Sequence, residues 1–481
     1  MHMKNILFIL FLFIGMPAVF SQRTFEYRAS LSGLVSTQKQ LPMWATANRY
    51  GILPENRGGL MQAGIFSDFN SRKTFQTAYG FSGAAFLTQN RNDILIDELY
   101  FILKWKKIRL DLGMKHPEEE FNGVSAQNGN ILESANTRTM PGYNLNTDYI
   151  RVPFTGNVLA FKFNYSDYLM MDKRFVDRTR LHHKSFFIRI TPWDRIDLIG
   201  GLDHWVQWAG NSPIYGKQPS SLKDYFRVIT GRNGAAGSTV SDSINALGNH
   251  LGRRYLRLNF RANTFQLSCY YDNLFEDGRP YHLHSLPDGT YGLYYGNRRE
   301  TPWISDVIYE LTYTKHQSGR YHDRPATPEE MEKQDPNDYY YGKIVLGGND
   351  NDFNNGEYRS GWTYYGRIIG TPFITPQAPN ADGITLGTNN NRVVAHYLGV
   401  KGYVARRIPY KFRLSYSQNY GTYGKPLKNS PRQCSFGLEA GILRNTKLPL
   451  LIDLGIYGDY GKLYDNNFGA SICISRKGII R

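Results

Sequence analysis

A chain of 481 residues with 47 glycines and 35 tyrosines but 3 cysteines cannot depend on a disulfide framework, and its length allows one large domain or several small ones. Glycine and tyrosine are spread along the whole chain, which favours one large domain. The formal net charge of +16 excludes a strongly acidic surface and indicates an anionic partner, such as lipopolysaccharide, an acidic polysaccharide or nucleic acid.

The first residues of the chain have the pattern of a secretory signal peptide. Lys4 precedes an apolar run from Ile6 to Phe20, and Val19 and Ser21 are small enough to flank a cleavage site. We therefore expect residues 1–21 to be removed and residues 22–481 to form the mature domain. Secretion argues against nucleic acid as the partner. No later segment reaches the ~18 uninterrupted apolar residues that a spanning helix needs.

Short runs in which apolar and polar residues alternate recur along the chain, on the order of eighteen times. Such runs include residues 159–166, 197–208, 256–261, 411–417 and 451–457. In the run at 197–208, Leu198 and Leu202 fall on one face of a strand, whereas Asp203 falls on the other. These runs predict strands that are apolar on one face and polar on the other.

The strands of a soluble β-sandwich alternate with the same period as those of a membrane barrel. The residues of the polar face distinguish the two folds. That face carries cations at successive positions, namely Arg257, Arg261, Lys411 and Arg413, while the other face is continuously apolar. Together with the signal peptide, this pattern predicts an all-β fold. We expect a transmembrane antiparallel β-barrel of about 18 strands in the outer membrane of a Gram-negative bacterium, with the cations lining the lumen.

Four long interruptions separate the alternating runs, at residues 116–148, 211–248, 317–341 and 371–391. Barrels of this kind have short turns on the periplasmic side and long loops outside, so we expect these segments to be extracellular or folded back into the mouth. Two of them contain short helix signals. Ser221 and Asp224 form a capping pattern, and Thr327-Pro328-Glu329-Glu330 has a cap followed by proline.

No motif of an enzyme is present in the sequence. A nucleophile elbow and a phosphate-binding loop are absent, and the calcium-loop-like residues 350–356 lack the required glycine and glutamate spacing. His282 and His284 share one face of an extended segment, and a hydrogen-bonded pair explains them better than a metal site. We therefore expect no enzymatic activity, no metal and no cofactor.

The chemistry that remains is suited to binding sugars. Aromatic rings can lie against pyranose faces, while charged side chains hydrogen-bond hydroxyl or carboxylate groups. The alternative for each ring is a place in the aromatic girdle at a membrane interface. The candidate polysaccharide-binding residues are Trp205, Trp208, Arg257, Arg261, Glu276, Asp277 and Tyr291.

Several short blocks, in their order along the chain, resemble the capsule assembly Wzi family. The blocks are LPMW (41–44), ANRYG (47–51), LHHK (181–184), GLDHWVQWAG (201–210), GNHLG (248–252), FEDG (275–278) and DGTYG (288–292). The resemblance implies an outer-membrane lectin-like barrel of about eighteen strands that holds capsular polysaccharide at the cell surface and is not itself the export channel. Enterobacterial members begin with a helical segment that plugs the periplasmic side. Residues 23–37 alternate like a strand instead, so a closure would have to be built from loops.

Three functions follow as hypotheses. The favoured one is a lectin-like barrel that attaches or organises capsular or extracellular polysaccharide, which the basic charge predicts to be acidic. The alternative is a porin or channel for anions or oligosaccharides. An outer-membrane enzyme is disfavoured because no nucleophile and base can be paired. Besides the polysaccharide, we expect contact with outer-membrane lipid and lipopolysaccharide, no nucleic acid partner, and a monomer.

Overall fold

The computed structural model describes residues 24–480 except 54–55, 70–72, 89–91, 235–245, 277–282, 284, 320–323, 335, 337–343, 346–349 and 445–449. The predicted signal peptide (residues 1–21) therefore lies outside the described residues, and so do Asp277, His282 and His284.

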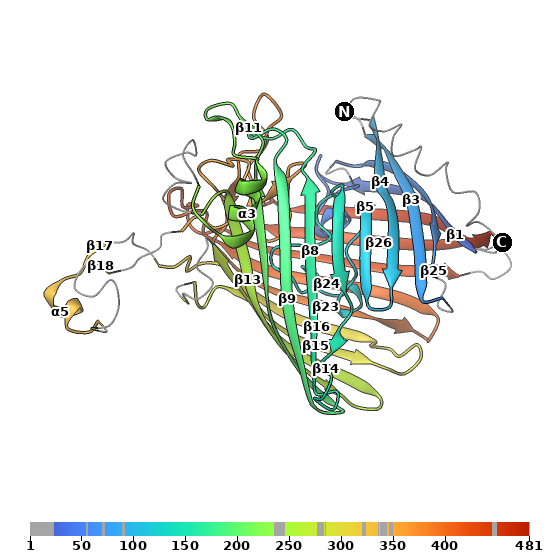
Figure 1. Cartoon of the computed structure of the whole chain (residues 1–481). Helices are drawn as coiled ribbons and strands as arrows, with labels where there is room; N and C mark the ends of the chain where they lie inside the picture. Colours follow the sequence, from blue (N-terminus) through green and yellow to red (C-terminus); the bar gives the residue numbers. More distant parts are fainter. Residues whose placement is uncertain are drawn as a thin grey trace.

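The described chain forms a closed antiparallel β-barrel (Figure 1). Each strand of the wall pairs with the strand before and after it, and β1 pairs with β27 from Phe25↔Ile480 to Ser36↔Gly469 to close the ring. The sheet has 19 strand segments. Because β6 and β7 both pair with β8 as two pieces of one strand, the wall has 18 strands, as predicted.

The wall strands are β1 (Phe25–Ser36), β2 (Gly58–Ser67), β3 (Phe75–Thr88), β4 (Asn92–Trp105), β5 (Ile108–Met114), β6 (Gly142–Thr147), β7 (Ile150–Arg151), β8 (Leu159–Leu169), β9 (Arg180–Trp193), β10 (Ile196–Trp208), β13 (Asn249–Arg261), β14 (Phe265–Glu276), β15 (Gly289–Asn297), β16 (Asp306–Tyr313), β23 (Val393–Val404), β24 (Ile408–Asn419), β25 (Arg432–Arg444), β26 (Leu450–Gly461) and β27 (Asn467–Ile480). Short hairpins are β11–β12 (Asn211–Ser212, Gly216–Lys217), β17–β18 (Arg324–Pro325, Ile344–Val345), β19–β20 (Thr363–Tyr364, Arg367–Ile368) and β21–β22 (Thr375–Pro376, Thr388–Asn390). The helices are α2 (Met43–Thr46), η2 (Phe121–Gly123), α3 (Leu222–Thr230) and α5 (Pro328–Met331).

The two faces of β10 show how alternation in the sequence becomes a membrane-spanning wall. Leu198 and Leu202 point outward and are 38% and 43% exposed, whereas Asp203 and Gln207 point inward and are buried. A bilayer accepts such a wall because every backbone group is paired within the closed sheet and only apolar side chains meet lipid. The predicted orientation of this strand is confirmed.

The two rims of the barrel differ in their connections. One rim carries both ends of the described chain and short turns such as 106–107, 194–195 and 262–264; we call it the short-turn rim. The opposite, long-loop rim carries the connections 37–57, 115–141, 209–248, 277–288 and 314–392. In outer-membrane barrels the longer connections face the exterior of the cell, so we assign the long-loop rim to the outside.

The predicted interruptions agree with these connections except in one boundary. Residues 211–248 fall within a long connection, and residues 317–341 and 371–391 both belong to the connection 314–392. The interruption predicted at residues 116–148 extends too far, because residues 142–147 form the wall strand β6. Both helix signals are confirmed, since α3 and α5 each begin with a capping box, at Ser221 and Thr327. Figure 1 shows α5 standing away from the barrel.

Among the residues that the structure describes, no helix combines the length and the apolar character that crossing a bilayer requires.

Because Leu202 lies at the middle of an outward-facing strand, its replacement should test the membrane-spanning wall directly. We expect Leu202→Arg to lower the free energy of unfolding by about 2–4 kcal/mol, whereas Leu198→Arg, nearer the short-turn rim, should cost at most about 1 kcal/mol. Equilibrium urea unfolding in lipid vesicles would measure both. Equal costs at the two positions would contradict the assigned depth.

Candidate functional site

Three segments from the long-loop rim fold back into the barrel, and we call residues 37–57, 115–141 and 351–376 together the plug. Trp44, Leu132 and Trp362, one from each segment, are completely buried. The segments are bonded to one another: the Tyr50 amide donates to the Ala135 carbonyl (2.6 Å), and the Trp362 indole donates to the Leu132 carbonyl (2.7 Å). The three segments therefore form a packed core inside the barrel.

The second plug segment is held by polar side chains that point inward from the wall. The Ala126 amide donates to Glu310 of β16 (2.8 Å), and the Ile131 amide donates to Asp272 of β14 (2.8 Å). The Tyr397 hydroxyl of β23 donates to the carbonyl of Val124 (2.8 Å). Buried backbone groups need such partners, so the inward polar face of the barrel serves as the binding surface for its own plug.

The first plug segment follows β1 and contacts strands from the other end of the chain. The Met43 amide donates to Asp459 of β26 (3.0 Å), and the Trp44 indole donates to Ser415 of β24 (2.9 Å). Arg49 forms an ion pair with Glu439 of β25. This segment therefore bridges β24, β25 and β26 from inside the barrel.

A buried network of charges joins the wall to the plug. Arg253 of β13 donates to Asp203 (2.5 Å) and to Asp272 (3.2 Å), and it also donates to the plug carbonyl of Gly129 (3.0 Å). His183 of β9 lies 2.9 Å from Asp203. Asp203 thus hydrogen-bonds inside the barrel. Charges that are this well paired stabilise a unique arrangement, while removing one partner costs on the order of 3–5 kcal/mol.

The two neighbouring histidines of β9 face opposite sides of the wall, as the alternation predicts. His183 stacks inside the lumen on Trp205, with ring centroids 3.6 Å apart. His182 points outward and lies 3.1 Å from Asp167 of β8.

A β-bulge in β4 places two consecutive acidic residues on the inner face. The register against β3 shifts between Ser82 and Gly83, so Asp97 and Glu98 are both buried on the lumen side. His116 lies 2.8 Å from Asp97 through Nε2, and its amide donates to Glu98 (2.9 Å). Bulges re-aim side chains in this way.

The residues Asp97, Glu98 and His116 are the one group in the described chain whose possible ligand atoms lie within 4.8 Å of one another. The two ring nitrogens of His116 face different carboxylates, at 2.8 Å and 3.6 Å. The ring also stacks on Tyr50, with centroids 3.6 Å apart. Because the imidazole lies between the carboxylates, the group is better described as an anchor of the plug than as a metal centre.

The cations predicted to line the lumen do point inward, and most are paired. Arg257 lies 3.2 Å from Glu120 of the plug. Arg261 forms an ion pair with Asp197, and Arg413 with Glu439. These arginines therefore neutralise the protein's own carboxylates, which leaves their charge less available to an anionic polymer.

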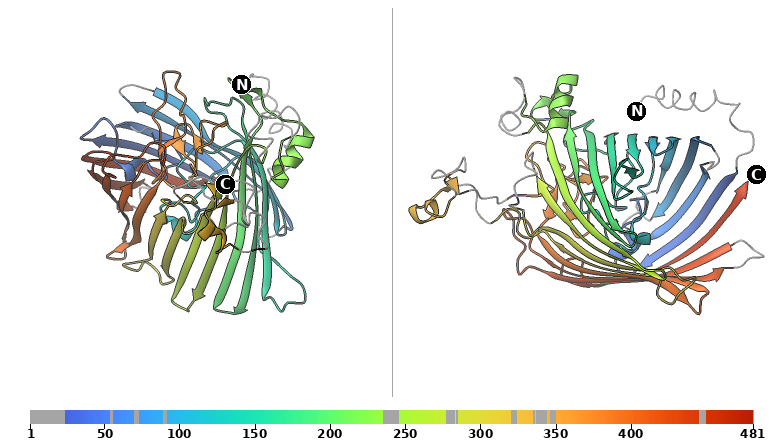
Figure 2. Two further views of the ribbon diagram at one scale, coloured as in Figure 1. Left: turned by 90° about the vertical axis from the view of Figure 1, so that its left-hand side faces the viewer. Right: turned by 60° about the horizontal axis from the view of Figure 1, so that its bottom comes forward.

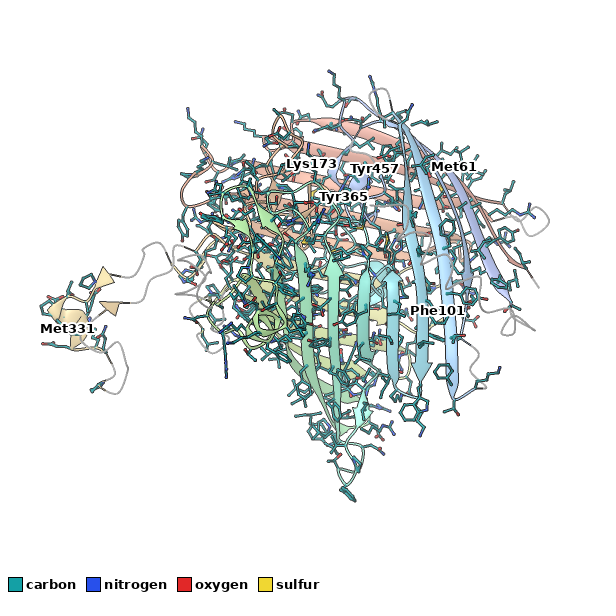
Figure 3. The ribbon with its side chains drawn as sticks, turned by 45° about the horizontal axis from the view of Figure 1, so that its top comes forward. Met61, Phe101, Lys173, Met331, Tyr365 and Tyr457 are labelled. Carbon is teal, nitrogen blue, oxygen red and sulfur yellow. The ribbon has the colours of Figure 1, made fainter. Side chains whose placement is uncertain are left out.

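An accessible group of aromatic and cationic residues lies at the long-loop rim, above the short strands β5 and β6. We call Arg138, Lys173 and Tyr365 the rim patch. Tyr365 is 43% exposed at the tip of the hairpin β19–β20, and the Arg138 guanidinium lies 4.3 Å from its ring centroid. The Tyr365 amide donates to Asp172 (3.2 Å), next to the exposed Lys173, and Figure 3 labels both Lys173 and Tyr365.

The seven residues predicted to bind polysaccharide do not form one surface. Trp205 is buried in the lumen against Trp362, and Trp208 is buried on the outside of the wall beneath α3. Arg257 and Arg261 line the lumen. Tyr291 stacks on Tyr271 on the outer wall, Glu276 accepts the amide of Phe353 (2.8 Å), and Asp277 lies outside the described residues.

No pattern in the sequence predicts the rim patch. Arg138 and Tyr365 lie in connections without a periodic pattern, and the ring meets the guanidinium only because two plug segments pack together. Finding the patch from sequence would require information on which distant residues contact each other in space.

No protein-family model matches the chain, and no curated protein matches it. Among solved structures, it is similar to Wzi of Escherichia coli, described as an outer-membrane protein involved in group 1 capsule assembly and a carbohydrate-binding β-barrel. The identity is 12%, the TM-score is 0.53, and the match covers 93% of this chain and 83% of that one. OccK3 (OpdO) of Pseudomonas aeruginosa has 8% identity and a TM-score of 0.49, with 96% of each chain covered. OprD of the same organism has 10% identity and a TM-score of 0.46, again with 96% of each covered.

At this level of identity the likeness to Wzi shows the fold. That fold, with its apolar outer face and its long connections at one rim, is that of an outer-membrane barrel of a Gram-negative bacterium, as predicted.

Glu133 of the plug lies beside the buried charges and should give the fold a measurable pH dependence. Burial raises the pKa of its carboxyl to about 7, with Asp203 raising it further and Arg253 lowering it. Because the folded-state pKa lies above the unfolded value, the native state holds this proton more tightly. The resulting stability is fully present below about pH 4 and is lost as the pH rises through about 7.

We expect Glu133→Gln to remove this part of the pH dependence. The difference in free energy of unfolding between wild type and variant should change by on the order of 1–3 kcal/mol between about pH 5 and pH 8. Urea unfolding in micelles at several pH values would measure it, with the exposed plug residue Glu119→Gln as control. A constant difference across this range would contradict the proposed titration.

Proposed function

We propose that this protein is a non-conducting outer-membrane barrel that holds an extracellular polysaccharide at the cell surface. The observation that carries the proposal is the plug, whose residues are hydrogen-bonded to the inner wall on β14, β16, β23, β24 and β26. A plug bonded to the wall on these strands obstructs the water-lined path that the conduction of ions requires. The function then has to reside on the outward-facing surface.

The rim patch has the chemistry that a sugar-binding surface needs. An exposed aromatic ring offers a flat apolar face to a pyranose, and a neighbouring guanidinium offers paired donors to hydroxyl or carboxylate oxygens. Tyr365 and Arg138 supply these two elements in contact with each other. Asp172 fixes the backbone of the tyrosine and is itself bonded to Arg174 (3.1 Å), so the ring is presented by a rigid base.

An acidic polymer fits the charge of the outward-facing connections. Because Arg257, Arg261 and Arg413 are already paired with carboxylates, the preference would rest on exposed cations at the long-loop rim. These are Lys39, Lys173, Arg178, Arg180, Lys217, Lys223, Arg232, Arg359, Lys425 and Lys428. Fixed positive charge attracts a polyanion, and salt weakens that attraction.

The likeness to Wzi, a carbohydrate-binding barrel involved in capsule assembly, supports the same assignment at the level of architecture. Of the residues predicted from the sequence, Glu276 and Tyr291 lie near the long-loop rim and are kept in the proposal as contacts of the polymer. The proposal also includes removal of residues 1–21 as a signal peptide and the absence of enzymatic activity.

A porin for anions is the second candidate, and one observation favours it. The inner wall toward the short-turn rim carries Arg189, Lys401 and Lys411 in addition to the paired arginines, so an anion could enter the barrel from that side. The plug would have to move before an anion could leave at the other rim.

Planar bilayer recordings separate the two functions. We expect the wild-type protein to show no steady conductance, because the plug is bonded to the wall. Deletion of residues 118–134 should open ion-conducting pores. Glu310→Ala removes the wall carboxylate that accepts two hydrogen bonds from the plug, and it should produce intermittent openings. Steady conductance of the wild-type barrel would favour the porin.

Binding of a uronate-bearing polymer, such as alginate, tests the rim patch. We expect the double variant Arg138→Ala/Tyr365→Ala to bind about tenfold more weakly than wild type in detergent, since it loses one stacking face and one guanidinium. Tyr416→Ala serves as control, because it removes an equally exposed tyrosine from the outer wall. Wild-type affinity should also fall as ionic strength rises from about 0.05 to about 0.5 M. An unchanged affinity in the double variant would remove the rim patch from the proposal.

A further inference from the structure

Helix α3 packs on the outside of the barrel wall, over the long-loop ends of β9 and β10 (Figure 2). Its inner face is formed by Val228 and Tyr225, which contact Val206 and Trp208 of β10. The helix is well defined by a capping box at Ser221. The helix therefore covers a part of the outer wall, whereas the outer face of the neighbouring strands contacts lipid.

The wall beneath α3 is polar on its outward face. Asp167 of β8 accepts hydrogen bonds from Tyr143 (2.5 Å) and from Tyr225 of the helix, and it lies 3.1 Å from His182. In the same outward rows, His204 and His250 are 3.0 Å apart. Such groups are costly against acyl chains, and Tyr225 of α3 covers Asp167 and His182. The Lys184 ammonium donates to the carbonyl of Ile229, which ties the end of the helix to the wall.

The outer face of α3 has no cover among the described residues. Leu222 and Phe226, one helical turn apart, are 79% and 65% exposed, and the adjoining hairpin β11–β12 adds the exposed side chains of Ile214 and Tyr215. Large apolar groups gathered in this way mark a surface that meets an apolar partner.

The position of this surface along the barrel axis matches the boundary between the apolar core of the bilayer and its outer head groups. Roughly ten residues of β10 separate its start near the short-turn rim from Val206, and a tilted strand of that length spans about the ~25 Å of an outer-membrane apolar belt. The rows below α3 present Phe186 and Leu202 to lipid. The helix thus lies where the acyl chains of the outer leaflet end and their head groups begin.

Cations surround the apolar face of α3. Arg180, Lys217, Lys223 and Arg232 are exposed, and Arg180 lies 5.2 Å from the ring centroid of Trp208. The nearby acidic groups are already paired: Asp224 with Arg227 (3.4 Å), and Asp177 with Arg178 (3.6 Å). The surface therefore combines apolar side chains with net positive charge.

We propose that the outer face of α3 and the hairpin β11–β12 form a binding site for the lipid A portion of lipopolysaccharide. Leu222 and Phe226 lie against its acyl chains, while Arg180, Lys217 and Lys223 neutralise its phosphates. A second copy of the chain is a poorer partner because two equally cationic surfaces repel each other. A zwitterionic phospholipid offers no net charge to match. The site is separate from the rim patch, and its cations Arg180, Lys217 and Lys223 are among those named above for the acidic polymer.

Binding of purified lipid A in mixed micelles tests the site. We expect Arg180→Glu/Lys217→Glu/Lys223→Glu to bind about tenfold more weakly than wild type, since each reversal removes one surface ion pair with phosphate. Because Arg180 contacts Trp208, Lys217→Glu/Lys223→Glu is made as well and should lose part of the affinity. The apolar variant Leu222→Ser/Phe226→Ser should also bind more weakly, while heat-modifiable migration on gels shows that the barrel is intact.

Lys425→Glu/Lys428→Glu is the matched control, because these exposed lysines follow β24, far from β9 and β10 in the order of the wall. This control should bind lipid A like the wild type. The proposal is overturned if the charge-reversed and apolar variants both bind normally, if the control loses as much affinity, or if phosphatidylglycerol micelles bind as tightly as lipid A.

Discussion

The structure depends on the hydrogen-bonded closure of a sheet whose two ends come from the two ends of the chain. A backbone in hydrocarbon has no water to pair with, so an open sheet edge is excluded there. The pairing of β1 with β27 over its whole length removes that edge. The closed sheet also separates lipid from lumen, so that one set of side chains meets lipid and the other meets the lumen.

That inward set then determines how the interior is filled. Asp272, Glu310 and Tyr397 point inward from β14, β16 and β23, and each bonds to the backbone of the plug. The barrel and the plug are thus complementary parts of one core, and Arg253 takes part in both. Such a core leaves the long-loop rim and the outer wall as the surfaces on which the proposed binding sites lie.

Strand parity could be predicted because it is a local property. Leu202 and Asp203 are neighbours in the sequence, and their opposite placement follows from the geometry of a strand. The surroundings of each side chain could not be predicted, because they depend on distant segments. Trp205 points inward as its parity requires, but it is buried because Trp362 packs on it. Trp208 points outward, but α3 covers it. The bulge at Asp97 reverses the parity within β4 without any proline or glycine in that strand to mark it.

The first plug segment has a consequence for how the wall behaves in the bilayer. In a barrel that closes between its first and last strands, separation of these two strands would open a lateral path into the membrane for an apolar molecule. Here the chain turns inward directly after β1, where Thr37 bonds to Asn467 of β27 (3.2 Å). It continues across the inner surface to Asp459, Glu439 and Ser415. Opening that junction would break these bonds as well as the ladder, so the wall is reinforced at the place where lateral release into the membrane would otherwise be easiest.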